Sequence, residues 1–137
     1  MALTHLLDSS VLTRLRHPAV REAIEARAER GELGRAEIGD LEIGYSARNP
    51  AEWDRLEEAL RAFELVETTA EHVRRAKQVQ RMLAAKHQRG SKVPDLLIAA
   101  AAESRSLTIL HYDADFDRIA AATGQSCEWV VPAGSVD

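Results

Sequence analysis

The chain contains one cysteine, Cys127, so it cannot form an internal disulfide or a metal site with several thiolate ligands. No apolar run approaches the roughly 20 residues that a helix needs to cross a bilayer. The N-terminal stretch MALTHLLDSS has no basic leader and meets its first acid at Asp8, unlike a secretory signal. Internal repeats and low-complexity segments are also lacking. These absences argue against disulfide-stapled, secreted and membrane-spanning proteins, and the expected compartment is a reducing cytoplasm.

What remains is the composition of a globular domain. A chain of 137 residues can bury a core but is too short for two such domains, so residues 1–137 are expected to form one domain. Hydrophobic residues make up 45% of the chain and charged residues 29%, which is not typical of a disordered protein.

The net charge of −4 hides an uneven distribution. The segment between His72 and Pro94 has no acid and contains the basic residues Arg74, Arg75, Lys77, Arg81, Lys86, Arg89 and Lys92. Such a segment is commonly a solvated helix face. It would also suit the phosphates of a nucleic acid, because clustered Lys and Arg displace counterions from the backbone. Composition leaves both interpretations open.

Short strand-like runs alternate with helical patterns along the chain. Strands are predicted at residues 3–7, 33–38, 64–68, 107–111 and 127–131. Helices are predicted at residues 18–31, from about Asp40, and at 50–63, 70–88, 95–104 and 115–124. Asp40 and Thr69 are the expected N-caps of their helices. This alternation predicts an α/β fold with a mostly parallel sheet of about five strands and helices on both faces.

Acidic residues stand where the predicted elements meet. Asp8 follows the first strand, Asp113 and Asp115 follow the strand that ends at His111, and Glu42 and Asp95 fall in the first turns of their helices. In an open parallel sheet, strand carboxyl ends and the following helix N-termini share one edge, where ligands bind. Each acid alone is also explained as a helix cap or by the helix dipole.

Together these acids indicate a cation site. Two carboxylates 4–5 Å apart repel by roughly 4 kcal/mol at an effective dielectric of 20, and a bound divalent cation reverses the sign. The candidates are all oxygen donors without cysteine or paired histidine, which favours Mg²⁺ or Mn²⁺ over zinc. Such ions support in-line cleavage of a phosphodiester. The basic segment, with Arg74, Arg75, Lys77 and Arg81, would then hold the substrate backbone.

The helix beginning at 94-PDLLIAAAAES-104 supports this interpretation. Pro94 disfavours helix in the residue before it, so Asp95 is among the first residues able to begin the helix. Residues 96–102 are apolar on every side, as expected for a helix held between a sheet and another element. A rigid, buried helix body would fix Asp95 at the sheet edge as a preorganised metal ligand.

The motifs 6-LLDSS-10, 95-DLLIAAAA-102 and 113-DADF-116, in this order and spacing, resemble those of PIN-domain ribonucleases. Among these, the chain is most similar to the VapC toxins of bacterial VapBC toxin–antitoxin pairs, nearly from end to end. The resemblance implies a flavodoxin-like sheet of order 3-2-1-4-5 and Mg²⁺- or Mn²⁺-dependent endoribonuclease activity on tRNA or ribosomal RNA. It also implies a homodimer and a cognate VapB-like antitoxin that holds the toxin inactive.

The resemblance assigns the acids of the family to Asp8, Glu42, Asp95 and Asp113, with Asp115 as an auxiliary acid. Ser10 matches the small polar residue that follows the first acid by two positions. Three positions depart from the family pattern, namely Gly39 and Ser46 around Glu42 and His111 in place of a Thr or Ser. His111 could be structural or could touch the scissile phosphate.

Two other functions remain open at the level of the sequence. A doubly wound binding or regulatory module without enzymatic activity would use the acids only as helix caps. Phosphoryl transfer through an aspartyl intermediate is a third class. Haloacid-dehalogenase-type sites carry a second acid two residues after the nucleophile, and Ser10 stands there instead.

Overall fold

The computed structural model describes residues 2–88 and 90–137, which form a single domain around one five-stranded sheet. The strands are β1 (His5–Leu7), β2 (Leu33–Ala36), β3 (Glu64–Val66), β4 (Thr108–His111) and β5 (Cys127–Trp129). The strand order is β3-β2-β1-β4-β5, and every neighbouring pair is parallel. The predicted α/β class and the 3-2-1-4-5 order are therefore confirmed.

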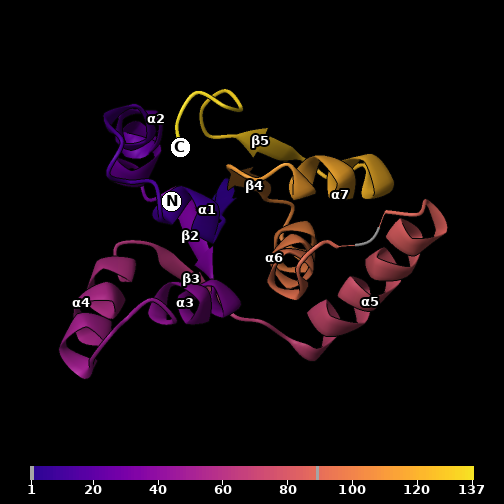
Figure 1. Cartoon of the computed structure of the whole chain (residues 1–137), viewed down its shortest axis with the longest axis horizontal. Coiled ribbons are helices and arrows are strands. Elements are labelled where there is room, and N and C mark those ends of the chain that lie inside the picture. The colour runs from indigo at the N-terminus through magenta and orange to yellow at the C-terminus, as the bar shows by residue number, and fades with distance from the viewer. Residues whose placement is uncertain (1, 89) are drawn as a thin grey trace.

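Helices cover both faces of this sheet (Figure 1). They are α1 (Ser9–Leu12), α2 (Pro18–Glu29), α3 (Glu37–Gly44), α4 (Pro50–Leu60), α5 (Ala70–Ala85), α6 (Val93–Ser104) and α7 (Asp115–Thr123). One hydrophobic cluster joins the strands to α5, α6 and α7, and a second joins them to α1 and α2. Within the described residues, no helix is both long and apolar enough to cross a membrane.

Helix α6 is the most buried helix, as its sequence predicts. It lies between the sheet and α5, and Leu96, Ile98 and residues 99–102 are all buried (Figure 1). The helix begins at Val93 rather than Asp95, with Pro94 as its second residue, which suits proline because the first helical N–H groups have no partner within the helix. Asp95 therefore occupies the first turn of a helix whose body is immobilised by packing.

The start of α3 differs from the prediction. The helix begins at Glu37, and Asp40 lies inside it instead of capping it. Asp40 instead pairs with Arg35, which is buried at 8% exposure and donates from Nε to Asp40 Oδ1 over 2.9 Å. Arg35 also donates from Nη1 to the main-chain oxygens of Leu60 and Phe63. A buried guanidinium needs such partners, so the Asp40 carboxylate is used in the core rather than at a helix end.

Two further local features bear on the site. Helix α1 is a single turn that the sequence analysis does not predict, and Asp8 caps it by accepting the amide N–H of Ser10. Thr69 is the N-cap of α5, as predicted, and His72 completes a reciprocal capping box with it. Because α1 follows β1 directly, the chain turns at Asp8 and brings the residues after it back over the carboxyl edge of the sheet.

Candidate active site

A cleft at the carboxyl edge of the sheet collects acids from four separate segments. Its lining includes Asp8, Glu42, Asp95 and Asp113, together with Ser10. These residues follow β1, lie in α3 and α6, and follow β4 respectively, with Ser10 in α1. The four acids and Ser10 that the sequence singles out therefore lie together.

Asp8 is buried at the base of this cleft, with 2% of its surface exposed. Its amide donates to the main-chain oxygen of Leu110 over 3.0 Å, which fixes it beside β4. Its Oδ2 accepts the Ser10 amide over 3.0 Å, while Oδ1 is buried without a hydrogen-bond partner among the described residues. Burial raises the pKa of the Asp8 carboxyl above its usual value, although the hydrogen bonds from Ser10 oppose this shift.

Asp95 has the most strongly perturbed carboxyl of the cleft. It is also 2% exposed, and its Oδ2 is buried without a partner in the described part of the chain. Burial, and then the negative charges of Asp8 and Asp113, raise the pKa of Asp95 to about 7. An anion at this position therefore lacks the compensation that proteins normally give to a buried charge.

Asp113 and Asp115, at and beyond the turn after β4, lie close to Asp95. One carboxylate oxygen from each of these three acids lies within 4.8 Å of the other two. Asp113 Oδ1 accepts the Asp115 amide over 2.9 Å, and Asp113 Oδ2 accepts from Lys92 Nζ over 3.3 Å. Asp115 is also paired with Arg118. Asp115, expected to be an auxiliary acid, therefore lies beside Asp95 and Asp113 but does not line the cleft.

Glu42 reaches the cleft from the second turn of α3, not from the first turn as the sequence predicts, because the helix begins at Glu37. Its Oε1 accepts from Ser9 Oγ over 3.1 Å. Burial and the charge of Asp8 raise the pKa of the Glu42 carboxyl. Glu42 thus belongs electrostatically to the same set of acids.

Ser10 and His111 hold the acid-bearing segments in place. Ser10 Oγ accepts the Tyr112 amide over 2.8 Å, which joins α1 to the segment after β4. His111 is fully buried behind the cleft, and its Nδ1 accepts the Asp113 amide over 3.2 Å. Its ring lies 5.0 Å from the rings of Phe116 and Trp129. Burial lowers the pKa of the His111 imidazole, so its neutral form is favoured.

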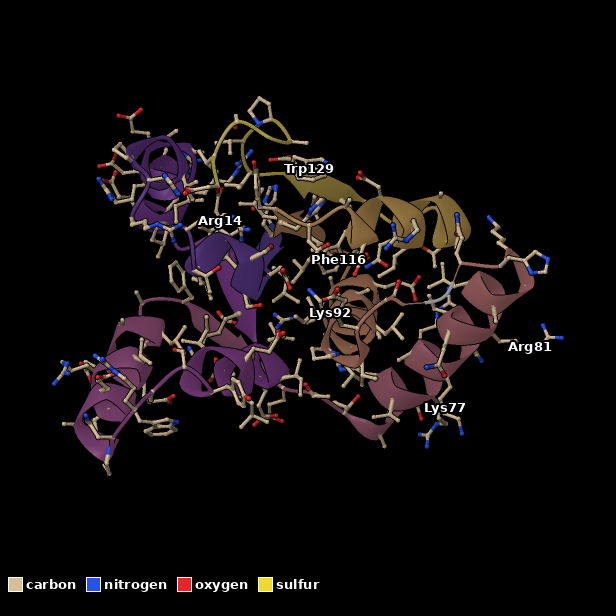
Figure 2. All side chains as sticks on the ribbon, viewed as in Figure 1. Arg14, Lys77, Arg81, Lys92, Phe116 and Trp129 are labelled. Atoms are coloured by element: carbon tan, nitrogen blue, oxygen red, sulfur yellow. The ribbon has the colours of Figure 1, made fainter. Side chains whose placement is uncertain are left out.

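The basic residues predicted to contact RNA lie apart from the cleft on α5. Arg74 pairs with Glu71, and Arg75 forms two hydrogen bonds with Glu103, of 2.7 and 3.1 Å. Lys77 and Arg81 extend from α5 on the opposite side of the view from Arg14 (Figure 2). Arg89 lies outside the described residues. A contact between these residues and RNA stays a prediction.

The cations in the cleft lining are Arg14 and Lys92. Arg14 is absent from the sequence-based site, although the short run 14-RLRH-17 just after the first acid is a signal that could have indicated it. Lys92 belongs to the basic segment of the sequence, but it is the N-cap residue of α6, whereas Arg74, Arg75, Lys77 and Arg81 lie on α5. Its bond to Asp113 offsets part of the acid charge, and the negative charge of Asp113 raises the pKa of the Lys92 ammonium.

The donor set fits a hard divalent cation. Asp8 and Asp95 each keep a buried carboxylate oxygen without a hydrogen-bond partner among the described residues. Asp95, Asp113 and Asp115 can each present an oxygen to one position, and Glu42 lines the same cleft. Carboxylate oxygens are the ligands that Mg²⁺ and Mn²⁺ prefer. A cation would compensate charges that the protein itself leaves unpaired.

Comparison with known proteins places this cleft in a family. The PIN domain model matches residues 5–122. The chain is 63% identical to Ribonuclease VapC51 of Mycobacterium tuberculosis over 137 residues, and the match covers 100% of both proteins. It is 44% identical to Ribonuclease VapC21 of the same species, and that match covers 98% of this chain and 99% of VapC21. The crystal structure of DNA-bound VapBC from Salmonella typhimurium matches with a TM-score of 0.76 and covers 94% of this chain and 99% of the matched chain. Because the sequence identity is 20%, this match shows similarity of fold alone. With matches of this extent, the chain belongs to the PIN-domain family and, within it, to the VapC ribonucleases.

Proposed function

We propose that the chain is a Mg²⁺- or Mn²⁺-dependent endoribonuclease and the toxin of a VapBC-type toxin–antitoxin pair. The observation that carries the proposal is the pair of buried carboxylates, Asp8 and Asp95, each with an oxygen that lacks a hydrogen-bond partner in the described residues. Buried charges of this kind are normally paired or bound to metal. The full-length similarity to VapC ribonucleases supports the same conclusion.

The acids would divide the work by their surroundings. Asp8, Asp95 and Asp113 would hold the ion, because they are fixed by β1, α6 and the turn after β4. Glu42 is half-buried and held by the Ser9 hydroxyl, so it suits the orientation of the attacking water. Asp115 would support the site by holding Asp113 through its amide.

A divalent cation at this position would polarise the phosphoryl oxygen, favour ionisation of water and stabilise the leaving oxygen of a phosphodiester. The chain itself supplies the orientation. Asp95, whose pKa is about 7 in the metal-free chain, must be ionised to hold the cation, and Lys92 lies beside Asp113, where it faces negative charge. His111 stays behind the acids and fixes the Asp113 amide.

The alternative of a binding module whose acids are only helix caps accounts for few of the contacts. Asp8 is a side-chain cap of α1. Asp113 likewise accepts the amide of Asp115, the first residue of α7. By contrast, α3 and α6 have no side-chain cap bond at their N-termini, so Glu42 and Asp95 do not serve in that way. Helix capping therefore leaves the burial of Asp95 and its approach to Asp113 unexplained.

The test combines ion binding with RNA cleavage. The parent chain should be stabilised against heat by Mn²⁺ or Mg²⁺ and should cut RNA only in their presence. Asp8→Asn and Asp95→Asn should lose both effects, whereas Asp54→Asn, an exposed acid of α4, should retain them. Equal metal stabilisation of all four proteins, without cleavage, would favour the binding module instead.

A VapB-like antitoxin and a second copy of the chain are the proposed partners, and structured tRNA or ribosomal RNA is the proposed substrate. The likeness in fold to structures of VapBC complexes supports the choice of antitoxin. Light scattering would test the homodimer. Sequencing of RNA ends after controlled expression, with and without the product of an adjacent small gene, would test the substrate and the neutralisation.

A further inference from the structure

A group of basic side chains lies in the segment that follows α1, and one of them, Arg14, lines the acid cleft. Arg14 lines the cleft with Asp8 and Asp113, and Arg16 and His17 follow it in the same segment. The Arg16 side chain is 61% exposed. We call Arg14, Arg16 and His17 the basic rim.

The basic rim already holds an anion of the chain itself. Arg14 Nε donates to the main-chain oxygen of Asp137 over 3.1 Å. The side chain of the same Asp137 lies 3.5 Å from Arg16 Nη2 and 2.6 Å from His17 Nε2. Arg14 and Arg16 therefore both donate to one acidic residue, and His17 Nε2 lies close to it without a hydrogen bond among the described residues. The Asp137 side chain remains 84% exposed. A group of donors arranged around an exposed carboxylate can exchange it for a phosphate, because both ligands present oxygen acceptors with negative charge.

Arg14 is preorganised for this role. Its Nη1 donates to the main-chain oxygen of Ser10 over 2.8 Å, and its guanidinium carbon lies 4.7 Å above the centre of the Tyr112 ring. Tyr112 is fixed in turn through its hydroxyl, which donates to the main-chain oxygen of Val136 over 2.7 Å. Nη2 of Arg14 makes no hydrogen bond to any described residue, so it keeps two donors for a ligand.

The other basic surface is less suited to the same ligand. Arg74 and Arg75 on α5 are paired with Glu71 and Glu103, and neither lines the cleft. Lys92 lines the cleft but interacts with Asp113. An RNA strand whose scissile phosphate meets the acids would bring its neighbouring phosphates close to the cleft, where Arg14 stands.

We propose that the basic rim binds a backbone phosphate of the RNA next to the scissile bond, and that this phosphate displaces Asp137. The inference rests on the proposed ribonuclease function and adds to it the place where the substrate backbone enters. Arg14 would bind the phosphate nearest the acids, and the exposed Arg16 would bind the strand farther out. Asp137 competes with the substrate for the same donors.

Two measurements test the basic rim, namely anisotropy of a fluorescently labelled tRNA transcript in EDTA and cleavage of the same transcript in Mn²⁺. Arg16→Gln should weaken RNA binding about three- to tenfold, and Arg14→Gln should do so at least as strongly, with a salt slope smaller by about 1. Asp137→Asn should act in the opposite direction and tighten binding about twofold or more. Arg55→Gln, at an exposed position of α4 outside the cleft lining, is the matched control and should bind as the parent does. Arg81→Gln tests the rival prediction that the basic residues of α5 hold the backbone.

The outcomes separate this inference from the proposed function. If the parent chain binds and cleaves RNA and both Arg14→Gln and Arg16→Gln bind it equally well, the basic rim is overturned while the ribonuclease proposal stands. A loss of RNA binding confined to Arg81→Gln would overturn the basic rim in the same way. A parent chain that neither binds nor cleaves the transcript would remove the ribonuclease proposal and the basic rim with it. Arg16 guards against misfolding as an explanation, since its hydrogen bonds are confined to Thr13 and Asp137 at the surface.

Discussion

Substitution of Asp95 by Asn should increase the free energy of unfolding, relative to the parent, as the pH rises, whereas most substitutions of buried residues decrease it. In the folded chain the pKa of Asp95 is about 7, compared with an ordinary value of 3.8. Because the folded value is the higher one, the favourable contribution of Asp95 is fully present below about pH 4 and is lost as the pH rises through about 7. At pH 8 the metal-free protein therefore carries an uncompensated buried carboxylate, which an Asn side chain would not have.

The magnitude follows from the distance between the two pKa values. One pKa unit corresponds to about 1.4 kcal/mol, so about two units of titration between pH 5 and pH 8 amount to roughly 2–3 kcal/mol. The free energy of unfolding of Asp95→Asn, minus that of the parent, should rise by this amount over that range. A packing cost of the Asn side chain would be the same at both pH values, so it cancels when the stability difference at pH 5 is subtracted from that at pH 8.

Chemical unfolding in EDTA at pH 5 and pH 8 measures this difference. Asp54→Asn serves as the control, because Asp54 is exposed on α4 and its difference from the parent should not change with pH. Addition of Mn²⁺ at about 100 times its dissociation constant should then stabilise the parent by roughly 2.7 kcal/mol and Asp95→Asn far less. A difference between Asp95→Asn and the parent that stays constant from pH 5 to pH 8 would refute the reasoning from buried charge.

Three other outcomes are expected. The apparent dissociation constant for Mn²⁺, measured by calorimetric titration, should fall about tenfold per pH unit between pH 5 and about 7 and then level off. The reason is that the Asp95 carboxyl, with its pKa of about 7, must lose its proton to bind metal. A dissociation constant that does not change with pH would contradict this. His111→Asn should retain cleavage and Mn²⁺ affinity better than His111→Leu. The side-chain oxygen of Asn can replace His111 Nδ1 as the acceptor of the Asp113 N–H, whereas Leu has no acceptor. Equal losses in both variants would show that this hydrogen bond is unimportant. Arg35→Met should lower the free energy of unfolding by about 3–5 kcal/mol in denaturant titrations, since it leaves Asp40 without its buried partner. Arg30→Met, at an exposed pair, should have a much smaller effect in the same titrations.

The sequence predicts the acids well because their positions depend on topology. Asp8 and Asp113 lie within two residues of a strand end, and Asp95 lies in the first turn of a buried helix. Once the strands are known to be parallel and their order is fixed, such residues meet at one edge whatever their rotamers. Glu42 depends on more than topology. Its turn in α3 is set by where that helix begins. Asp40, the cap expected from the sequence, lies inside the helix and pairs with Arg35, a contact that periodicity does not reveal.

The basic side chains are harder to predict for a physical reason. A long cation can be neutralised by any acid within its reach, so its charge in the sequence says little about the charge it offers to a ligand. Arg75 looks available in the sequence but is held by Glu103 on α6, a residue 28 positions away. Arg14 lies outside the main basic segment of the sequence, yet the turn of α1 and the ring of Tyr112 bring it beside the acids.

The distribution of charge in the cleft has a consequence for catalysis. Acids that bind a metal also repel the phosphates on either side of the scissile bond, and this repulsion acts on a substrate that has not yet gained its contact with the ion. Arg14 and Lys92 are the cations in the cleft lining, and they come from the segments after α1 and before α6. The acids alone therefore account for ion binding, while attraction of the RNA backbone to the same place falls to Arg14, because Lys92 is engaged by Asp113. Loss of Arg14 should weaken RNA binding without removing the carboxylates that bind the ion.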